Sequence, residues 1–288
     1  MTIALDTPDT DRLVAVGGAL RDWQEEGAPM QLHPGDLGWY WRAGPRATAA
    51  AVRTWSRGGR ILAVGLLDGP GLVRLTTAPD ARRDEELARR LAADLTAPAR
   101  GLLPEGRAAV EAPEDALVRE LLGEAGWGID EAWSPLRRDL GAPVAEPGLR
   151  IEVAGPGRAH LVAEVVRGAF EGSRFTDERW HAMAAGPLFG DARCLLAYDD
   201  RGDAVATVTV WSAGPGRPGL LEPMGVHRDH RGRGHGRAIT LAAAGALQEL
   251  GSSSALVCTP SANTGGVITY VAGGFERRPE IHDRFRSA

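Results

Sequence analysis

The loop that precedes the helix-like run at residues 236–250 has the residue types of an anion-binding site. Its six residues, Arg231 to Gly236, read RGRGHG and follow a strand-like run at residues 220–226. The first N–H groups of a helix have no partner within the helix, and the helix dipole is positive at that end. Glycine also lets the backbone approach an anion closely. The spacing therefore predicts that a phosphate binds where this loop enters the helix.

Two well-known phosphate-binding loops do not match this stretch. A Walker P-loop needs Gly-Lys-Ser/Thr, and the sequence contains no such triplet. A dinucleotide-binding loop needs Gly-x-Gly-x-x-Gly, but the third glycine position falls on Arg237 when counted from Gly232 and on Ile239 when counted from Gly234. An ordinary surface turn remains the alternative for the loop.

Three histidines flank the loop, but their pattern does not indicate a metal site. His227, His230 and His235 match no metal-ligand spacing. The arginines between them would repel a cation. We therefore expect no metal.

Composition narrows the class of protein. The chain has 288 residues and a net charge of −5, which does not favour a nucleic acid or an anionic membrane as partner. No apolar run reaches the roughly 18 residues of a membrane span. Asp6, Asp9 and Asp11 lie where a signal peptide would need positive charge. Cys194 and Cys258 form no metal or disulfide pattern. We expect a cytoplasmic protein, and the sequence indicates no oligomeric state.

The second half of the chain alternates strand-like and helix-like runs. Strands are expected at residues 149–153, 193–198, 204–211, 220–226 and 254–259, and helices at residues 158–170, 176–185, 236–250 and 263–272. Gly265 and Gly266 weaken the prediction of the last helix, because glycine disfavours a helix interior.

The first half has a similar order of elements. Helices are expected at residues 10–24 and 112–125, with a third that starts at Asp80 and carries a leucine stripe, and strands at residues 38–42, 60–67, 71–76 and 107–111. Residues 117–127 repeat the helix, glycine and aromatic order of residues 267–275. The segment that corresponds to the basic loop, residues 77–83, contains no glycine. The repeat predicts two domains of one fold, of which only the second has the phosphate loop.

Residues 220–275 resemble the GCN5-related N-acetyltransferases (GNAT). The loop matches the signature Gln/Arg-x-x-Gly-x-Gly/Ala of that family. Asn263, Tyr270 and Gly274-Phe275 match its second marker. The resemblance covers residues 149–288 well and residues 1–140 only in layout. It implies an α+β fold of two GNAT-like domains, each a mixed, mostly antiparallel sheet flanked by helices, an arrangement shared with mycothiol synthase. The expected division is a degenerate domain at 1–140, a Pro- and Gly-rich linker at 141–148 and a catalytic domain at 149–288.

The resemblance implies acetyl-CoA as co-substrate. Its pyrophosphate would lie on the loop amides, its pantetheine arm along the strand before the loop, and a strand amide would face the thioester carbonyl. Asn263 would cap the short helix or bond the arm. The residues implied in cofactor binding are Met224, Val226, Arg231, Gly232, Arg233, Gly234, His235, Gly236, Arg237 and Asn263.

Two residues are candidates for proton transfer. Glu222, at the head of the signature strand, is the candidate base for the substrate ammonium; the alternative is an ordinary surface glutamate. Tyr270 is the candidate donor to the departing thiolate, with reference pKa values near 10 for a phenol and about 8.5 for a thiol. Its alternative role is packing under the cofactor.

The expected reaction is acetyl transfer to a primary amine of a small molecule, such as an antibiotic or a specialised metabolite. Phe175, Trp180 and Trp211 could line the acceptor pocket, or equally belong to the core. Both cysteines fall in strands expected to be buried, so direct attack is favoured over a covalent carrier. The alternatives are a non-catalytic acyl-CoA-binding regulatory protein, a transferase of a longer acyl chain and a mycothiol-synthase-like acetyltransferase.

Overall fold

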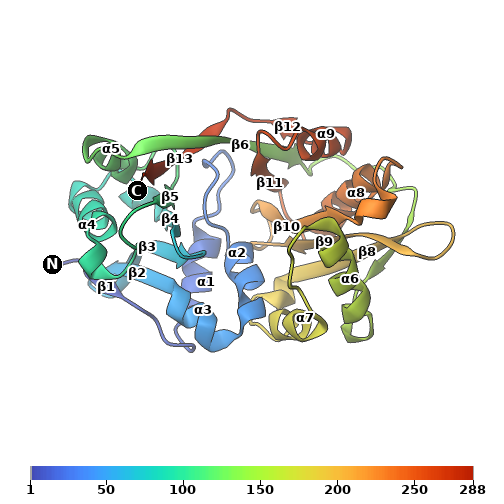
Figure 1. Cartoon of the computed structure of the whole chain (residues 1–288), viewed down its shortest axis with the longest axis horizontal. Coiled ribbons are helices and arrows are strands. Elements are labelled where there is room, and N and C mark those ends of the chain that lie inside the picture. The colour runs from blue at the N-terminus through green and yellow to red at the C-terminus, as the bar shows by residue number, and fades with distance from the viewer. Residues whose placement is uncertain (1, 288) are drawn as a thin grey trace. The chain divides into compact units, whose positions relative to one another are not determined.

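The computed structural model describes residues 2–287, which divide into two compact units. Unit 1 comprises residues 1–33, 45–133 and 280–288, and unit 2 comprises residues 34–44 and 134–279. Figure 1 labels the elements of both units. The units therefore do not follow the order of the chain. The linker at residues 141–148, which would separate two copies of one fold, stays a prediction. The division by contacts differs from it, because residues 34–44 belong to unit 2 and the C-terminal strand β13 (Ile281–Arg286) belongs to unit 1.

Unit 1 is built on a sheet in the order β1-β2-β3-β4-β5-β13-β6. Its strands are β1 (Ala4–Asp6), β2 (Val52–Arg57), β3 (Arg60–Leu67), β4 (Leu72–Thr77), β5 (Ala108–Glu111), β13 (Ile281–Arg286) and the first part of β6 (Gly128–Asp139). Its helices are α1 (Leu13–Asp22), α3 (Pro45–Ala51), α4 (Glu85–Thr96) and α5 (Leu117–Glu124), with short 3-10 turns η2 (Pro79–Ala81) and η3 (Pro98–Arg100). Strands β4 and β5 are parallel. The antiparallel pairs are β1 with β2, β2 with β3, β3 with β4, β5 with β13, and β13 with β6.

Unit 2 is built on a sheet in the order β6-β11-β10-β9-β8-β7, and β12 pairs with the second part of β6. Its further strands are β7 (Arg150–Val153), β8 (Ala192–Tyr198), β9 (Ala204–Trp211), β10 (Gly219–Val226), β11 (Ser254–Pro260) and β12 (Glu276–Arg277). Its helices are α2 (Pro34–Tyr40), α6 (Ala159–Ala169), α7 (Asp177–Ala184), α8 (His235–Glu249) and α9 (Thr264–Ala272). The 3-10 turns are η1 (Trp41–Ala43), η4 (Pro156–Arg158), η5 (Phe189–Asp191) and η6 (Arg228–His230).

The expected fold class is confirmed: each unit is a mixed, mostly antiparallel sheet with helices packed on it. In unit 2, α8 covers one face of the sheet and α6 and α7 lie on the opposite face (Figure 1). The face under α8 forms a core in which Ile239, Ala243 and Leu247 are completely buried against Val208 and Leu221. These residues are four positions apart along α8, so their side chains lie on one side of the helix. Their burial holds the start of α8 beside β10.

Strands β10 and β11 separate soon after they begin. In the described chain, their parallel pairing is limited to Gly219 with Ala255 and Leu220 with Leu256. On its other side β10 stays paired with β9 as far as Val226. The edge of β10 that faces β11 is therefore without a strand partner from Leu221 onward, directly before the loop that enters α8.

The strand predicted at residues 38–42 is wrong. Residues 34–40 form the helix α2, and the 3-10 turn η1 follows. The aromatic residues in this stretch suggested a strand, but Pro34 is favourable in the first turn of a helix. Gly35 and Gly38, one turn apart, both pack on the ring of Trp211. Tertiary packing therefore outweighs the local preference.

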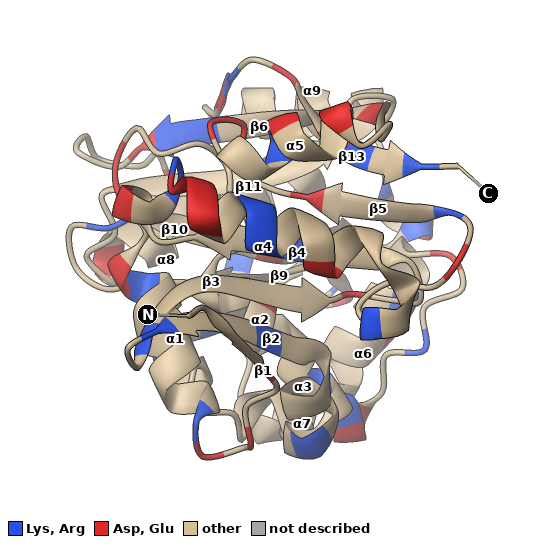
Figure 2. Cartoon of the chain, turned by 90° about the vertical axis from the view of Figure 1, so that its left-hand side faces the viewer, with Lys and Arg blue, Asp and Glu red and all other residues tan. Residues whose placement is uncertain are grey.

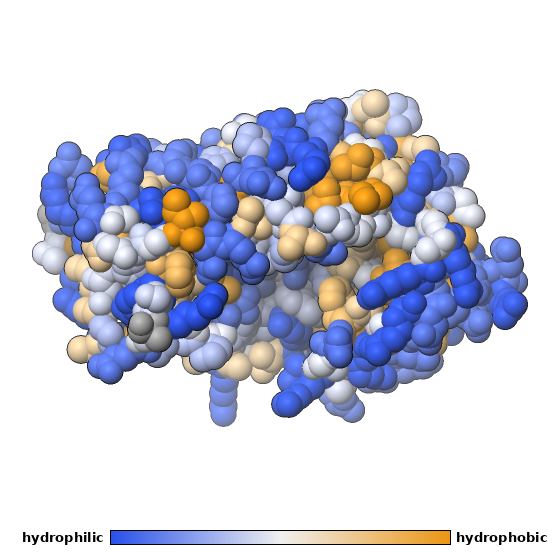
Figure 3. Space-filling model, turned by 45° about the horizontal axis from the view of Figure 1, so that its top comes forward, coloured by the Kyte–Doolittle hydropathy of each residue, from blue (hydrophilic) through white to orange (hydrophobic). Residues whose placement is uncertain are grey.

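Figure 3 shows one face of the protein, on which hydrophilic residues predominate and apolar ones form small separate patches. The large apolar side chains that are exposed are Val14, Ile129, Val153, Phe170, Ile268 and Val271. Isolated apolar side chains of this kind are ordinary on protein surfaces. Among the residues described, no helix is long and apolar enough to span a membrane.

We predict that Ile239→Ala lowers the melting temperature of the protein by roughly 5–15 °C, because removing buried methyl groups costs about 2–5 kcal/mol. The side chain is completely buried between α8 and the sheet. Thermal unfolding followed by circular dichroism measures the effect. The matched control is Val14→Ala on α1, whose side chain is 61% exposed. An equal loss in both variants would contradict the packing described for α8.

Candidate functional site

The loop before α8 has the backbone conformation of an anion cradle. Gly232 and Gly234 both have φ in the left-handed region, at +75° and +83°, which other residues rarely adopt. Gly234 is the N-cap of α8. A Cβ at either glycine would meet open space, so the two glycines are required for the conformation of the loop and not for close packing.

The start of α8 carries no negative charge of its own. Within the described residues, no side chain caps it and its first turn contains no Asp or Glu. By contrast, Thr176 caps α7 and Asn263 caps α9 through their side-chain oxygens. The amides of the first turn of α8 are therefore left to an external acceptor, so the loop fits a phosphate group.

Gly236 serves a different purpose from the other two glycines. A Cβ at this position would lie 2.7 Å from Cγ2 of Thr269, so glycine allows α8 to approach α9. Gly273 has the same role at the C-terminal end of α9, where a Cβ would overlap Thr240. The glycine spacing thus sets the distance between the phosphate loop and the helix that carries Tyr270.

The three arginines assigned to the phosphate differ in their contacts. The Arg231 guanidinium donates to the carbonyl of Ala169 at 2.7 Å and to that of Val226 at 3.3 Å. Arg237 donates to the carbonyl of Ala272 at 3.1 Å. These two arginines tie the loop and α8 to the ends of α6 and α9.

Arg233, in the middle of the loop, is exposed. It forms no hydrogen bond or ion pair with any other described residue. Of the three arginines, Arg233 therefore has the most donors available for an anion.

The three histidines lie together at the base of the loop. The rings of His227 and His230 are 5.7 Å apart, and those of His230 and His235 are 6.4 Å apart. Burial lowers the pKa of His235, and the charges of His230 and Arg233 lower it further. His235 is therefore neutral at neutral pH. In the part of the chain that the structure describes, no group of three or more His, Cys, Asp or Glu residues could hold a metal ion.

Helix α9 brings Tyr270 to the core side of the site. The side-chain oxygen of Asn263 accepts from the N–H of Gly266 at 3.1 Å, which caps the helix despite its two early glycines. The helix expected at residues 263–272 is confirmed. Tyr270 is 7% exposed. Burial raises the pKa of the Tyr270 phenol, and the negative charges of Glu222 and Cys258 raise it further.

Glu222 lies at an irregular point of β10. The pairing of β10 with β9 shifts between Leu221 and Met224, and Pro223 has no N–H to donate to a ladder. The indole N–H of Trp211 donates to the backbone carbonyl of Glu222 at 2.7 Å. The negative charge of Glu222 contributes to the raised pKa of the Tyr270 phenol, after the larger effect of burial.

Met224 and Val226 are the strand residues assigned to the pantetheine arm. They pair with Val208 and Ala206 of β9, and both are partly exposed. The hydroxyl of Thr240 on α8 donates to the sulfur of Met224 at 3.3 Å. The edge of β10 opposite β9 is the one that β11 leaves, so an extended ligand could pair there.

The aromatic residues named for the acceptor pocket are buried. Phe175, Trp180 and Trp211 have exposed fractions of 3%, 1% and 1%. Trp39 of α2 stacks on Phe175 with ring centroids 5.2 Å apart. The burial of the three side chains indicates a packing role, and their contact with an acceptor stays a prediction.

The two cysteines differ in burial. Cys194 is buried, and burial raises its thiol pKa, as expected for an unreactive thiol. Cys258 on β11 is only partly buried, although its strand was expected to be buried. In its ionised form, Cys258 contributes to the raised pKa of Tyr270.

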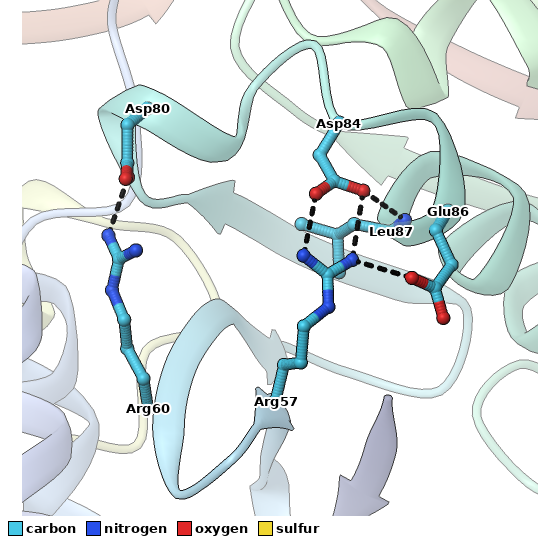
Figure 4. Close-up of polar contacts among 6 residues, drawn as sticks. All are labelled: Arg57, Arg60, Asp80, Asp84, Glu86 and Leu87. Carbon is cyan, nitrogen blue, oxygen red and sulfur yellow. Dashed lines mark hydrogen bonds and ion pairs between the residues drawn. The ribbon is translucent and has the colours of Figure 1, made fainter. Parts of the chain in front are cut away.

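The corresponding helix of unit 1, α4, starts very differently. Its N-cap is Asp84, whose carboxylate accepts from the N–H of Leu87 at 2.8 Å. Arg57 binds both oxygens of Asp84 and also reaches Glu86 at 3.0 Å (Figure 4). Figure 2 shows acidic residues at the start of α4. Carboxylates thus occupy the position that α8 leaves to an external anion.

The expected start of this helix at Asp80 is wrong. Asp80 lies in the turn η2 and pairs with Arg60, and the N-cap of α4 is Asp84, four residues later. Both Asp80 and Asp84 are good N-caps by type, so the local sequence did not separate them.

Sequence reasoning missed one part of unit 2. The segment 34–44, from the N-terminal third of the chain, packs beside β9 and β10 through Trp211. The pair of glycines at a spacing of 3, after a proline, was the available signal of a helix packed on a large side chain.

Comparison with known proteins agrees with this geometry. Residues 161–275 match the family model "Acetyltransferase (GNAT) family". A mycothiol acetyltransferase of Cellulomonas flavigena is 32% identical over 192 residues, which cover 62% of this chain and 53% of that protein. The chain therefore spans about half the length of this curated relative.

Solved structures extend the likeness of fold to the whole chain. A GCN5-related N-acetyltransferase of Sphaerobacter thermophilus matches with a TM-score of 0.59 at 19% identity, over 99% of this chain and 95% of that one. A tandem GNAT protein from the clavulanic acid biosynthesis pathway matches with a TM-score of 0.57 at 18% identity, over 99% and 98%. Residues 161–275 are thus similar to the GNAT family, and the chain has the fold of two GNAT-like domains.

We predict that Asp84→Ala destabilises unit 1 by about 1–2 kcal/mol, because it removes both a helix cap and the partner of Arg57. The matched control is Asp80→Ala, which removes an exposed ion pair with Arg60 and changes stability by less than about 1 kcal/mol. Chemical denaturation followed by circular dichroism compares the two variants. A larger effect at Asp80 would contradict the assigned start of α4.

Proposed function

We propose that this protein is an N-acetyltransferase that transfers an acetyl group from acetyl-CoA to a primary amine of a small molecule. The observation that carries the proposal is the start of α8, which lacks any capping carboxylate among the described residues and follows the open edge of β10 after one short turn and the glycine loop. The family of residues 161–275 supports the same chemistry.

Acetyl-CoA would bind along two neighbouring backbone surfaces. The first-turn amides of α8 and the guanidinium of Arg233 would hold the pyrophosphate, with Gly232 and Gly234 allowing close approach. The edge of β10 at Met224 and Val226 would hold the extended arm. When bound, acetyl-CoA supplies a thioester whose carbonyl carbon accepts a nucleophile.

Glu222 would take a proton from the substrate ammonium, which leaves a neutral amine for attack. The nitrogen–carbon bond then forms, the nitrogen loses one further proton to solvent, and the carbon–sulfur bond breaks, with the electron pair leaving on sulfur. Tyr270, which lies on α9, would meet that sulfur with its hydroxyl.

Tyr270 would act mainly as a hydrogen-bond donor. Its pKa is raised by burial and by nearby negative charge, so the phenol stays protonated at neutral pH. A thiol has a reference pKa of about 8.5, so complete proton transfer from this phenol to a thiolate is uphill. The hydroxyl would therefore stabilise the developing negative charge on sulfur, and solvent would complete the protonation.

The proposed acceptor is a small metabolite that carries a primary amine. The relative from Cellulomonas flavigena is named for mycothiol acetylation, which favours a small metabolite over a macromolecule. Antibiotics and specialised metabolites that carry a primary amine are the compounds to test first. We further propose that unit 1 binds no acetyl-CoA, because Asp84, Glu85 and Glu86 would repel its pyrophosphate.

The direct test is to incubate the protein with acetyl-CoA and a broad panel of amines. Release of free thiol and the mass of the product are measured together. We expect an acetylated primary amine and an equal amount of coenzyme A. Binding of acetyl-CoA without thiol release for any amine would favour the alternative, a non-catalytic regulatory protein.

We predict that Arg233→Ala weakens acetyl-CoA binding by about tenfold or more, the equivalent of one charge-assisted hydrogen bond. Isothermal titration calorimetry measures the dissociation constant. The matched control is Arg46→Ala, which removes the same charge from an exposed position on α3 of unit 1. Equal weakening in both variants would indicate an effect of net charge and contradict the assigned contact.

We predict that Tyr270→Phe lowers kcat by about 10²- to 10³-fold, as the loss of one preorganised donor does, with little change in acetyl-CoA affinity. Because its pKa is raised, Tyr270 should cause no loss of wild-type activity between pH 8 and about 10. Steady-state kinetics across pH measure both effects. Unchanged turnover in Tyr270→Phe would exclude Tyr270 from the reaction.

A further inference from the structure

Trp211 connects a segment from the start of the chain to the proposed base. Its indole N–H donates to the backbone carbonyl of Glu222 at 2.7 Å. Trp211 is the last residue of β9, and its backbone pairs with Leu220 of β10, two residues before Glu222. Trp211 is 1% exposed, so its indole is shielded from water, whereas Glu222 is partly exposed.

The hydrogen bond falls where the ladder between β9 and β10 is interrupted. Regular pairing stops at Leu221 and resumes at Met224. Pro223 cannot donate to the ladder, because it has no N–H. The Trp211 indole therefore supplies a donor at the point where the sheet does not, and it fixes the backbone of Glu222 in one position.

Helix α2 holds the indole from one side. Gly35 and Gly38 face the ring so closely that a Cβ at either position would overlap it. Phe189 of η5 contacts the ring edge-on, with centroids 6.0 Å apart at 79°. A ring confined between glycine backbone and an aromatic neighbour has little freedom to rotate, so its N–H direction is fixed.

We propose that Trp211 is a positioning residue for Glu222 and that helix α2 keeps the Trp211 indole in the orientation that makes this possible. The inference rests on the proposed function, and it adds a role for residues 34–40. The N-terminal part of the chain then contributes to acetyl transfer through a helix that belongs to unit 2.

The first experiment compares Trp211→Phe, Glu222→Gln and the double variant in steady-state kinetics. Trp211→Phe keeps an aromatic ring against α2 and loses the N–H donor. We expect kcat to fall by about three- to tenfold, as for one neutral hydrogen bond, with the KM for acetyl-CoA unchanged. In the Glu222→Gln background the same substitution should cause no further fall, because the group being positioned is already lost.

If the fall in kcat of the double variant equals the product of the falls in the two single variants, the inference is overturned, since Trp211 would then act through another group. Unchanged kcat in Trp211→Phe, or unchanged turnover in Glu222→Gln, would overturn it as well. If the wild-type protein transfers no acetyl group to any amine, it is the proposed function that fails.

The second experiment does not depend on activity. The indole N–H of Trp211 is followed by hydrogen exchange in nuclear magnetic resonance spectra, and its signal is assigned by its absence from Trp211→Phe. We expect slow exchange in the wild type and rapid exchange in Gly38→Ala, whose added Cβ displaces the ring. The matched control is Gly18→Ala on α1, where a Cβ meets open space. Rapid exchange in the wild type, or slow exchange in Gly38→Ala, would overturn the proposed role of α2.

Discussion

The site depends on backbone N–H groups at the start of α8 for which the described residues supply no side-chain acceptor. Gly234 caps the helix by conformation alone, and in the described chain no carboxylate lies in its first turn. The rest of unit 2 supports this arrangement. Burial of the Ile239 face fixes the helix on the sheet, and Arg231 ties the loop to the end of α6. Stability is thus supplied by packing around a helix end that remains open to an anion.

The two units show how one helix position can be adapted to opposite purposes. In unit 1 the start of α4 is capped by Asp84. The hydrogen bond with Arg57 is the main reason why the pKa of Asp84 is lowered. In unit 2 the same position has glycines and exposed arginine. A capping carboxylate stabilises the helix but repels phosphate, so one helix start cannot serve both purposes. This exclusion is the physical basis for proposing a single acetyl-CoA site.

Features set by local sequence were predicted well. The strand, loop and helix around Gly234 and the capped helix with Tyr270 follow from spacing and caps within a few residues. Features set by distant contacts were not. Residues 34–40 have strand-like aromatics, and their glycines pack on the ring of Trp211, which lies far along the chain. The bond from Trp211 to Glu222 likewise depends on an interrupted ladder that no spacing rule specifies.

The central claim is that acetyl-CoA binds at the start of α8 and not at the start of α4. Hydrogen–deuterium exchange of backbone amides, measured by mass spectrometry with and without acetyl-CoA, tests it most directly. The account predicts slower exchange in peptides that cover residues 224–240 and no change in peptides that cover residues 79–90. Protection confined to residues 79–90, or no protection at residues 224–240 at saturating acetyl-CoA, would contradict it.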